Sequence, residues 1–170
     1  MSQFCDLIVI PKSYIVRMIS FRRTNANDSD FIQLVDQLNA ELLVLEGDQH
    51  EFYAQYDKID NIKYAIVAYE NNKPVGCGSI KNFGDDSMEI KRMFVHPNLR
   101  RSGVASLIIE ELEKWSRELG YYTCVLETGT NNPKAVALYN RLGFEVIPNY
   151  GQYKGVDTSI CFRKKLETKD

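Results

Sequence analysis

The segment VHPNLRRSGVASLIIEELEKW, residues 95–115, places two arginines, a serine and a glycine immediately before an amphipathic helix. The first backbone N–H groups of a helix have no partner within it, and Ser102 alone could cap them. Gly103 would also let an anion approach the backbone, and Arg100 and Arg101 would add charge-assisted hydrogen bonds. The segment therefore suits a diphosphate. The alternative is an ordinary capped helix with two solvated arginines, because one glycine-rich helix start is a weak signal.

Length and charge limit the classes of protein to consider. The chain has 170 residues, 44% of them hydrophobic, which fits one domain with a real core. Its net charge of −2 argues against a general nucleic-acid binder, whose surface would be strongly basic. No apolar run approaches the roughly 18 residues that a membrane span needs. We therefore expect a soluble, cytoplasmic protein with neither a nucleic-acid nor a membrane partner.

The cysteines and histidines predict neither a metal site nor a thiol nucleophile. The four cysteines are far apart and form no Cys-x-x-Cys motif: Cys5, Cys77, Cys124 and Cys161. Three of them lie in apolar runs, so we interpret them as reduced, small hydrophobic residues. With His50 and His96 as the only histidines, we expect no metal cofactor.

The N-terminal residues 1–17 form an extension of uncertain role. The run CDLIVI is too short and too poorly flanked for a signal peptide, and Met18 would itself be a sensible start. The extension either packs on the domain or adds an edge strand. We place the domain at residues 18–165 and a C-terminal tail at 166–170.

Hydrophobic periodicity along the domain alternates between 2 and 3.6 residues, which predicts an α/β (α+β) fold. Asn27 or Asp28 can cap the first helix, Gly47 can end it, and Gly120 can end the second. The expected elements are a strand at 14–22, a helix at 27–47, a three-stranded antiparallel meander at 63–95, a helix at about 103–119, a strand at 122–128, a short helix at 133–143, and strands at 144–147 and 159–166.

Two motifs resemble those of the GNAT superfamily of acetyl-CoA-dependent N-acetyltransferases. RRSGVA, Arg100 to Ala105, is similar to the family signature R/Q-x-x-G-x-G/A. Downstream, NPKAVALYNRLGF resembles N-x-x-A-x-x-L-Y-x-x-x-G-F. The residues on matching positions are Asn132, Ala135, Leu138, Tyr139, Gly143 and Phe144. The order of elements over about 150 residues also resembles the family fold.

The resemblance implies a single domain with a central mixed, mostly antiparallel sheet flanked by helices. A mid-sheet bulge would splay the strand ending at Val95 from the strand at 122–128, with the pantetheine arm of acetyl-CoA in the gap. The implied cofactor-binding residues are Met93, Phe94 and Val95 for the arm, and Arg100, Arg101, Ser102, Gly103, Val104, Ala105 and Ser106 for the diphosphate. Asn132 would hydrogen-bond the arm, cap the helix after it, or do both.

Three residues are candidates for catalysis. The resemblance gives Tyr139 the role of general acid toward the leaving CoA thiolate; the alternative is a core tyrosine. A general base is needed because an amine is mostly protonated at pH 7. Glu89, six residues before Val95, resembles the general base of histone-type members of the family. Glu127, five residues before Asn132, resembles the general base of members that acetylate protein N-termini. We favour Glu89, with Glu127, water or no dedicated base as alternatives. Either carboxylate could instead serve only to bind neighbouring backbone, Lys91 or Arg92.

The expected activity is acetyl transfer from acetyl-CoA to a primary amine by direct attack in a ternary complex. The amine could belong to a small molecule, an amino acid, a peptide or a protein. The acidic segment 46–60 and the tyrosine-containing turn 149–155 would suit a small cationic acceptor, although both could equally be ordinary solvated surface. The alternative is a catalytically silent CoA-binding or partner-binding module, which needs neither Tyr139 nor buried carboxylates. The oligomeric state, a homodimer included, is not readable.

Overall fold

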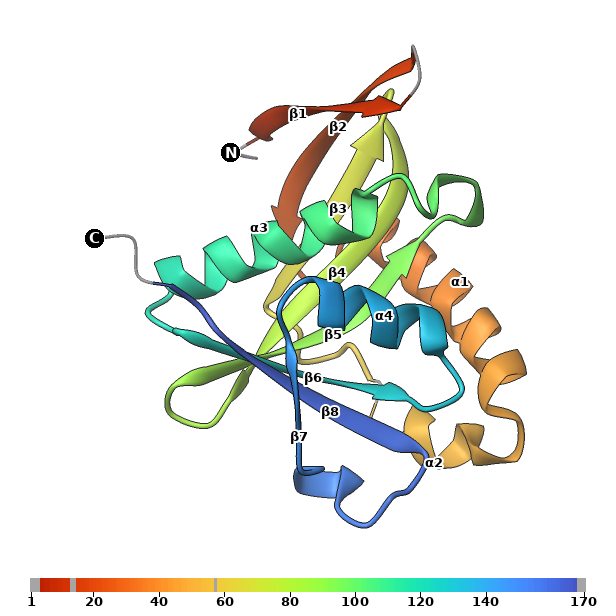
Figure 1. Cartoon of the computed structure of the whole chain (residues 1–170). Coiled ribbons are helices and arrows are strands. Elements are labelled where there is room, and N and C mark those ends of the chain that lie inside the picture. The colour runs from red at the N-terminus through yellow and green to blue at the C-terminus, as the bar shows by residue number, and fades with distance from the viewer. Residues whose placement is uncertain (1–3, 13–14, 57, 168–170) are drawn as a thin grey trace.

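One eight-stranded sheet, in the order β1-β2-β3-β4-β5-β6-β8-β7, organises the chain (Figure 1). The computed structural model describes residues 4–12, 15–56 and 58–167. The strands are β1 (Phe4–Lys12), β2 (Ile15–Thr24), β3 (Tyr64–Glu70), β4 (Lys73–Phe83), β5 (Ser87–Val95), β6 (Thr123–Gly129), β7 (Glu145–Ile147) and β8 (Ser159–Lys165). Neighbouring strands are antiparallel except β5 and β6, which are parallel. The predicted mixed, mostly antiparallel sheet is confirmed.

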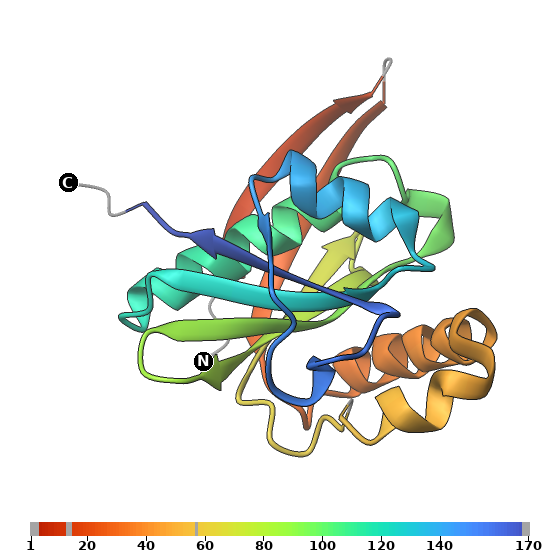
Figure 2. The same ribbon diagram turned by 60° about the horizontal axis from the view of Figure 1, so that its bottom comes forward.

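Helices cover both faces of this sheet. They are α1 (Ser29–Glu46), α2 (His50–Ala54), α3 (Val104–Glu118) and α4 (Pro133–Arg141), with short 3₁₀ turns at Gly47–Gln49, Pro97–Leu99 and Gly151–Tyr153. Figure 2 shows α3 and α4 on one side of the sheet and α1 with α2 on the other. Within the described chain, every predicted helix and strand is present.

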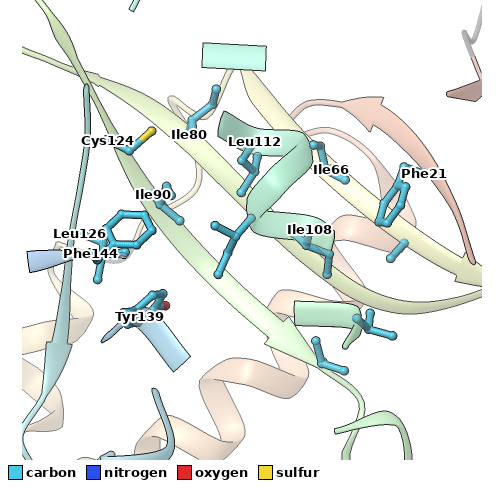
Figure 3. Packing of buried hydrophobic residues seen from close by; sticks show 14 of the residues in the cluster. Phe21, Ile66, Ile80, Ile90, Ile108, Leu112, Cys124, Leu126, Tyr139 and Phe144 are labelled. Atoms are coloured by element: carbon cyan, nitrogen blue, oxygen red, sulfur yellow. The ribbon is translucent and has the colours of Figure 1, made fainter. Parts of the chain in front are cut away.

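Strand alternation divides the core into two layers. In β3, Ile66 and Ala68 pack toward α3, whereas Ala65, Val67 and Tyr69 pack toward α1, as the period of two requires. The larger layer contains Ile108 and Leu112 of α3, which lie against the sheet in Figure 3. All of these side chains are at most 8% exposed, so the two-sided burial fixes which face each strand residue presents.

Strand β1 forms the edge of the sheet by pairing antiparallel with β2. The N-terminal segment thus takes the edge-strand position, one of the two placements expected for it. Because β2 runs without a break from Ile15 to Thr24, the expected domain start at residue 18 falls inside a strand. Residues 1–3 and 168–170 lie outside the described part of the chain.

A bulge in the middle of the sheet positions the functional site. The β4–β5 register shifts between Cys77 and Ser79, which face Phe94 and Lys91 and leave one extra residue on β5. Arg92 there has a φ of 57°, a left-handed conformation that is uncommon outside glycine. The pairing of β5 with β6 has already ended at Glu89, three residues before Arg92.

The β5–β6 ladder is correspondingly short. It extends only from Ser87 to Glu89 on β5 and from Thr123 to Val125 on β6, although the strands continue to Val95 and Gly129. The two strands therefore separate after their third pair, and the predicted splay in the middle of the sheet is confirmed.

Candidate functional site

A cavity of about 160 Å³ lies where β5 and β6 separate. It is bounded by α1 and α2 on one side and by the start of α4 on the other. Five of the residues predicted from sequence line it: Glu89, Met93, Glu127, Asn132 and Tyr139. The fold therefore brings together side chains from β5, β6 and α4 that are up to 50 positions apart in the chain.

Glu89 and Glu127 project from the same face of the sheet. Their neighbours Ile90 and Leu126 pack into the core under α3, so alternation turns both carboxylates toward α1. Glu89 is only 7% exposed. Its Oε1 accepts a hydrogen bond from the Tyr150 hydroxyl at 3.0 Å, and its Oε2 lies 3.8 Å from Lys91 Nζ. Both oxygens of this buried carboxylate thus already have partners.

Glu127 occupies a different position in the splay. It lies two residues beyond Val125, where the β5–β6 pairing ends, and is half-buried beside the cavity. Its charge acts on the phenol of Tyr139. Glu127 is therefore the carboxylate on the Tyr139 side of the cavity, beyond the last strand pair.

Tyr139 belongs to the hydrophobic core and also lines the cavity. Its ring packs 5.8 Å from the rings of both Phe144 and Phe162, and the residue is 6% exposed. Figure 3 shows it beside Phe144 at the edge of the core. Burial, and then the charge of Glu127, raises the pKa of its hydroxyl. The phenol therefore stays neutral throughout the working pH range.

The loop before α3 has the backbone that the opening motif requires. Arg101 and Gly103 have φ values of 64° and 92°, both in the left-handed region. Gly103 is the N-cap of α3 and, within the described chain, no side chain hydrogen-bonds this helix start. The expectation that Ser102 could cap it is wrong, because its hydroxyl instead donates to the carbonyl of Leu99. The first-turn N–H groups of α3 are therefore left for another acceptor.

Helix α1 shows the contrasting arrangement. Its N-cap is Asp28, one of the two residues expected, and the carboxylate accepts hydrogen bonds from Asp30 N and Phe31 N, each at 3.0 Å. Gly47 ends the helix, as predicted, with a φ of 53°. An ordinary capped start is thus available to this chain, and α3 does not use one.

Arg100 points away from the start of α3. Its Nε donates to the carbonyl of Val95 at 2.9 Å, and its Nη2 donates to both carboxylate oxygens of Glu41, at 2.6 and 2.7 Å. The guanidinium also lies 5.7 Å from the centre of the Phe94 ring. Arg100 therefore connects the end of β5 to α1.

The residues predicted to bind the pantetheine arm lie along the splay and at the start of α4. Met93, Phe94 and Val95 lie on the part of β5 that has lost β6 as a neighbour, so their backbone on that side faces the gap. Asn132 is the N-cap of α4, and its Oδ1 accepts from Ala135 N at 3.3 Å. This capping bond leaves its amide nitrogen able to donate toward the cavity.

The acidic segment 46–60 and the tyrosine-containing turn 149–155 also meet at this cavity. Tyr53 and Tyr153 line it, and the Tyr53 hydroxyl bonds Thr158 at 2.8 Å and Ser159 at 3.0 Å. Sequence reasoning placed tyrosines here but missed the Tyr150–Glu89 contact and Glu41 altogether. Both partnerships join residues about 60 positions apart, so no local pattern could signal them.

Neither a metal site nor a reactive thiol is apparent in the residues that the structure describes. Among them, no group of three or more His, Cys, Asp or Glu side chains could hold a metal ion. Burial raises the thiol pKa of Cys77 to about 12 and of Cys124 and Cys161 to about 11. The prediction for Cys5 lies outside the described side chains. No helix in the described ranges is both long and apolar enough to cross a membrane.

Comparison with known proteins identifies the family. The acetyltransferase (GNAT) family model matches residues 31–144, so the chain belongs to the GNAT acetyltransferase family and is an acyltransferase. An IAA acetyltransferase of Azospirillum brasilense is 29% identical over 151 residues, covering 87% of this chain and 98% of that protein. The uncharacterized N-acetyltransferase YjgM of Escherichia coli is 28% identical, covering 82% and 86%.

Solved structures share the fold. A putative acyl-CoA N-acyltransferase from Klebsiella pneumoniae has a TM-score of 0.73 and 25% identity, covering 88% of this chain and 98% of that one. A GNAT family acetyltransferase from Elizabethkingia anophelis, solved with acetyl-CoA bound, has a TM-score of 0.64 and 19% identity, covering 87% and 98%. The motif-based assignment to this superfamily is thereby confirmed.

Proposed function

We propose that this protein transfers the acetyl group of acetyl-CoA to a primary amine by direct attack in a ternary complex. The observation that carries the proposal is the cavity at the β5–β6 splay, which combines a neutral buried phenol with carboxylates on the opposite strand face. The relative from Elizabethkingia anophelis, solved with acetyl-CoA bound, supports this choice of cosubstrate. The amine and the thioester would meet inside this cavity.

The cosubstrate would lie along the gap and the start of α3. The free side of β5 at Met93–Val95 offers backbone groups to the pantetheine arm, which would replace β6 as the neighbouring strand. The diphosphate would bind the first-turn N–H groups of α3, which the helix dipole makes electropositive. The positive φ of Gly103 and the exposed Arg101 suit that role, and the Asn132 amide can donate to the arm.

Glu127 is the general base in this proposal, which reverses the preference drawn from sequence. Glu89 already accepts from Tyr150 and lies beside Lys91, so its carboxylate organises this wall of the cavity. Glu127 is more exposed and lies beyond the last strand pair, next to Tyr139. It can take the proton that the amine must lose, either directly or through one water.

Tyr139 is the general acid. The amine nitrogen forms a bond to the thioester carbonyl carbon, the carbon–sulfur bond breaks, and the sulfur leaves as a thiolate. The Tyr139 hydroxyl gives its proton to that sulfur, and burial keeps this proton in place until then. A backbone N–H near Val95 would stabilise the developing oxyanion. The three buried thiols with raised pKa values support direct transfer over a cysteine intermediate.

The acceptor is a small cationic amine in this proposal. Three carboxylates line the cavity, those of Glu46, Glu89 and Glu127, against two cations, Lys91 and Arg92. The lining therefore has one carboxylate in excess, and both cations are engaged, Lys91 beside Glu89 and Arg92 Nη1 donating to Asn39 at 2.7 Å. An ammonium group therefore fits better than an acceptor that carries a carboxylate.

The charge of the amine acceptor should determine how efficiently it is acetylated. Tyramine should be acetylated with a kcat/KM at least about tenfold above that of tyrosine, because the added carboxylate would face the acidic wall. The measurement is release of the CoA thiol from acetyl-CoA. Preference for tyrosine would contradict the assignment of the acceptor class.

Gly103 should be needed for acetyl-CoA binding. Gly103→Ala should weaken binding by about tenfold, because the new methyl group keeps the diphosphate from the backbone. Gly120→Ala is the matched control, since Gly120 ends α3 with a similar φ of 88° and has open space around it. Both changes should lower the melting temperature comparably, and only the first should alter the affinity measured by calorimetry. Equal affinities in the two variants would refute the diphosphate site.

The two carboxylates should respond differently to neutralisation. Glu127→Gln should lower kcat/KM at pH 7 by about 10²-fold or more, with partial recovery at high pH, where free amine is abundant. Glu89→Gln should have a smaller effect. A larger loss in Glu89→Gln would make Glu89 the base, and small losses in both would indicate water.

Tyr139→Phe should lower kcat by about a hundredfold. The ring and its packing against Phe144 and Phe162 remain, so the melting temperature and the acetyl-CoA affinity should change little. Steady-state turnover with an active amine, a melting curve and calorimetry together test this. Near-normal turnover in the folded variant would show that Tyr139 is a core residue only.

A further inference from the structure

Only the first part of helix α1 is anchored in the core. Its buried residues are Phe31, Leu34, Val35 and Leu38. Beyond Leu38, Leu42 is half-buried against the same core, whereas Leu43, Val44 and Leu45 are 56%, 85% and 41% exposed. The C-terminal part of α1, residues 39–46, therefore gains little from hydrophobic burial.

Three polar contacts hold this part of the helix instead. Asn39 Oδ1 accepts from Arg92 at the β5 bulge at 2.7 Å, and Glu41 accepts from Arg100 in the loop before α3. The carbonyl of Leu45 accepts from Asn131 Nδ2 at 2.7 Å, just before α4. All three donors come from segments that border the splay.

The same part of α1 forms a wall of the cavity. Leu42, Leu45 and Glu46 line it on the side where the acceptor would enter. Arg100 belongs to the loop that would hold the diphosphate, and Asn131 precedes Asn132, which would bind the arm. One set of contacts thus joins the cosubstrate segments to the acceptor wall.

We infer that Arg100 is a positioning residue that acts through Glu41, so that acetyl-CoA binding fixes the α1 wall of the acceptor site. The inference rests on the proposed cosubstrate. The bond from Arg100 Nε to the Val95 carbonyl orients the guanidinium, and Glu41 then accepts at both oxygens. An exposed ion pair of this kind contributes little to global stability, so its effect should be local.

Amide hydrogen exchange tests this coupling in the full chain. Acetyl-CoA at saturation should slow exchange at residues 39–46 of the wild-type protein, by about fivefold for a coupling of about 1 kcal/mol. In Glu41→Gln and in Arg100→Gln this slowing should be lost, and in Glu41→Gln calorimetry should show the acetyl-CoA affinity within about twofold of wild type. The double variant should behave like either single variant, because all three remove one interaction.

A matched control separates this effect from the general loss of an ion pair. Glu118 pairs with Arg23 through both carboxylate oxygens and has a similarly exposed side chain, 44% against 43% for Glu41. Glu118→Gln should leave the acetyl-CoA effect at residues 39–46 intact. Residues 30–36, which are anchored in the core, serve as an internal reference in every spectrum.

Other outcomes would overturn the inference. If Arg100→Gln weakens acetyl-CoA binding tenfold and Glu41→Gln strengthens it, Arg100 is a diphosphate ligand that Glu41 restrains. If exchange at 39–46 is unchanged or faster with acetyl-CoA bound to the wild type, the wall is not coupled to the cosubstrate. Failure of the wild-type protein to bind acetyl-CoA would instead refute the proposed function itself.

Discussion

The early end of the β5–β6 ladder is the constraint on which the rest of the site depends. A strand pair that stops after Glu89 and Val125 leaves backbone groups without a neighbouring strand, and such groups are costly to bury. Three residues further along β5, the extra residue at Arg92 and its left-handed φ interrupt the regular pairing with β4 as well. The missing stretch of sheet therefore leaves a gap in which an extended ligand could pair with the free edge of β5.

The two faces of the sheet differ in polarity at the splay. Toward α3 the splay is closed by packed rings, so the Tyr139 phenol is desolvated and stays protonated. Toward α1 the same strands present Glu89 and Glu127, whose charges need polar surroundings. Strand alternation thus turns the two carboxylates toward α1, while helix α4 brings the Tyr139 phenol to the splay from the other face. In the proposed mechanism, this arrangement would let one narrow cavity both donate and accept a proton.

Much of the fold could be predicted because its signals are local. Periodicity located the helices and strands, Asp28 and Gly47 are local end signals of α1, and two motifs predicted the loop before α3 and the cavity residues of α4. The contacts that decide roles within the site are not local. Arg100 reaches Glu41 and Tyr150 reaches Glu89 across the fold, and neither partner belongs to a motif. Sequence could therefore name both candidate carboxylates but could not show that Tyr150 and Lys91 contact Glu89.

The two long helices, α1 and α3, begin differently: the start of α1 serves stability, and the start of α3 is suited to binding. Helix α1 begins with a carboxylate cap that satisfies its own N–H groups, and a cap of this kind contributes about 1 kcal/mol. Helix α3 forgoes such a cap, with Gly103 at its start and the Ser102 hydroxyl turned to Leu99. Yet Val104, Ile108, Ile109 and Leu112 are fully buried, so packing can hold α3 in place without help from its first turn. Because packing in the core holds α3 in place, the N–H groups of its first turn are available to bind an anion. Arg100, in the loop before α3, can therefore contact α1 on the other face of the sheet.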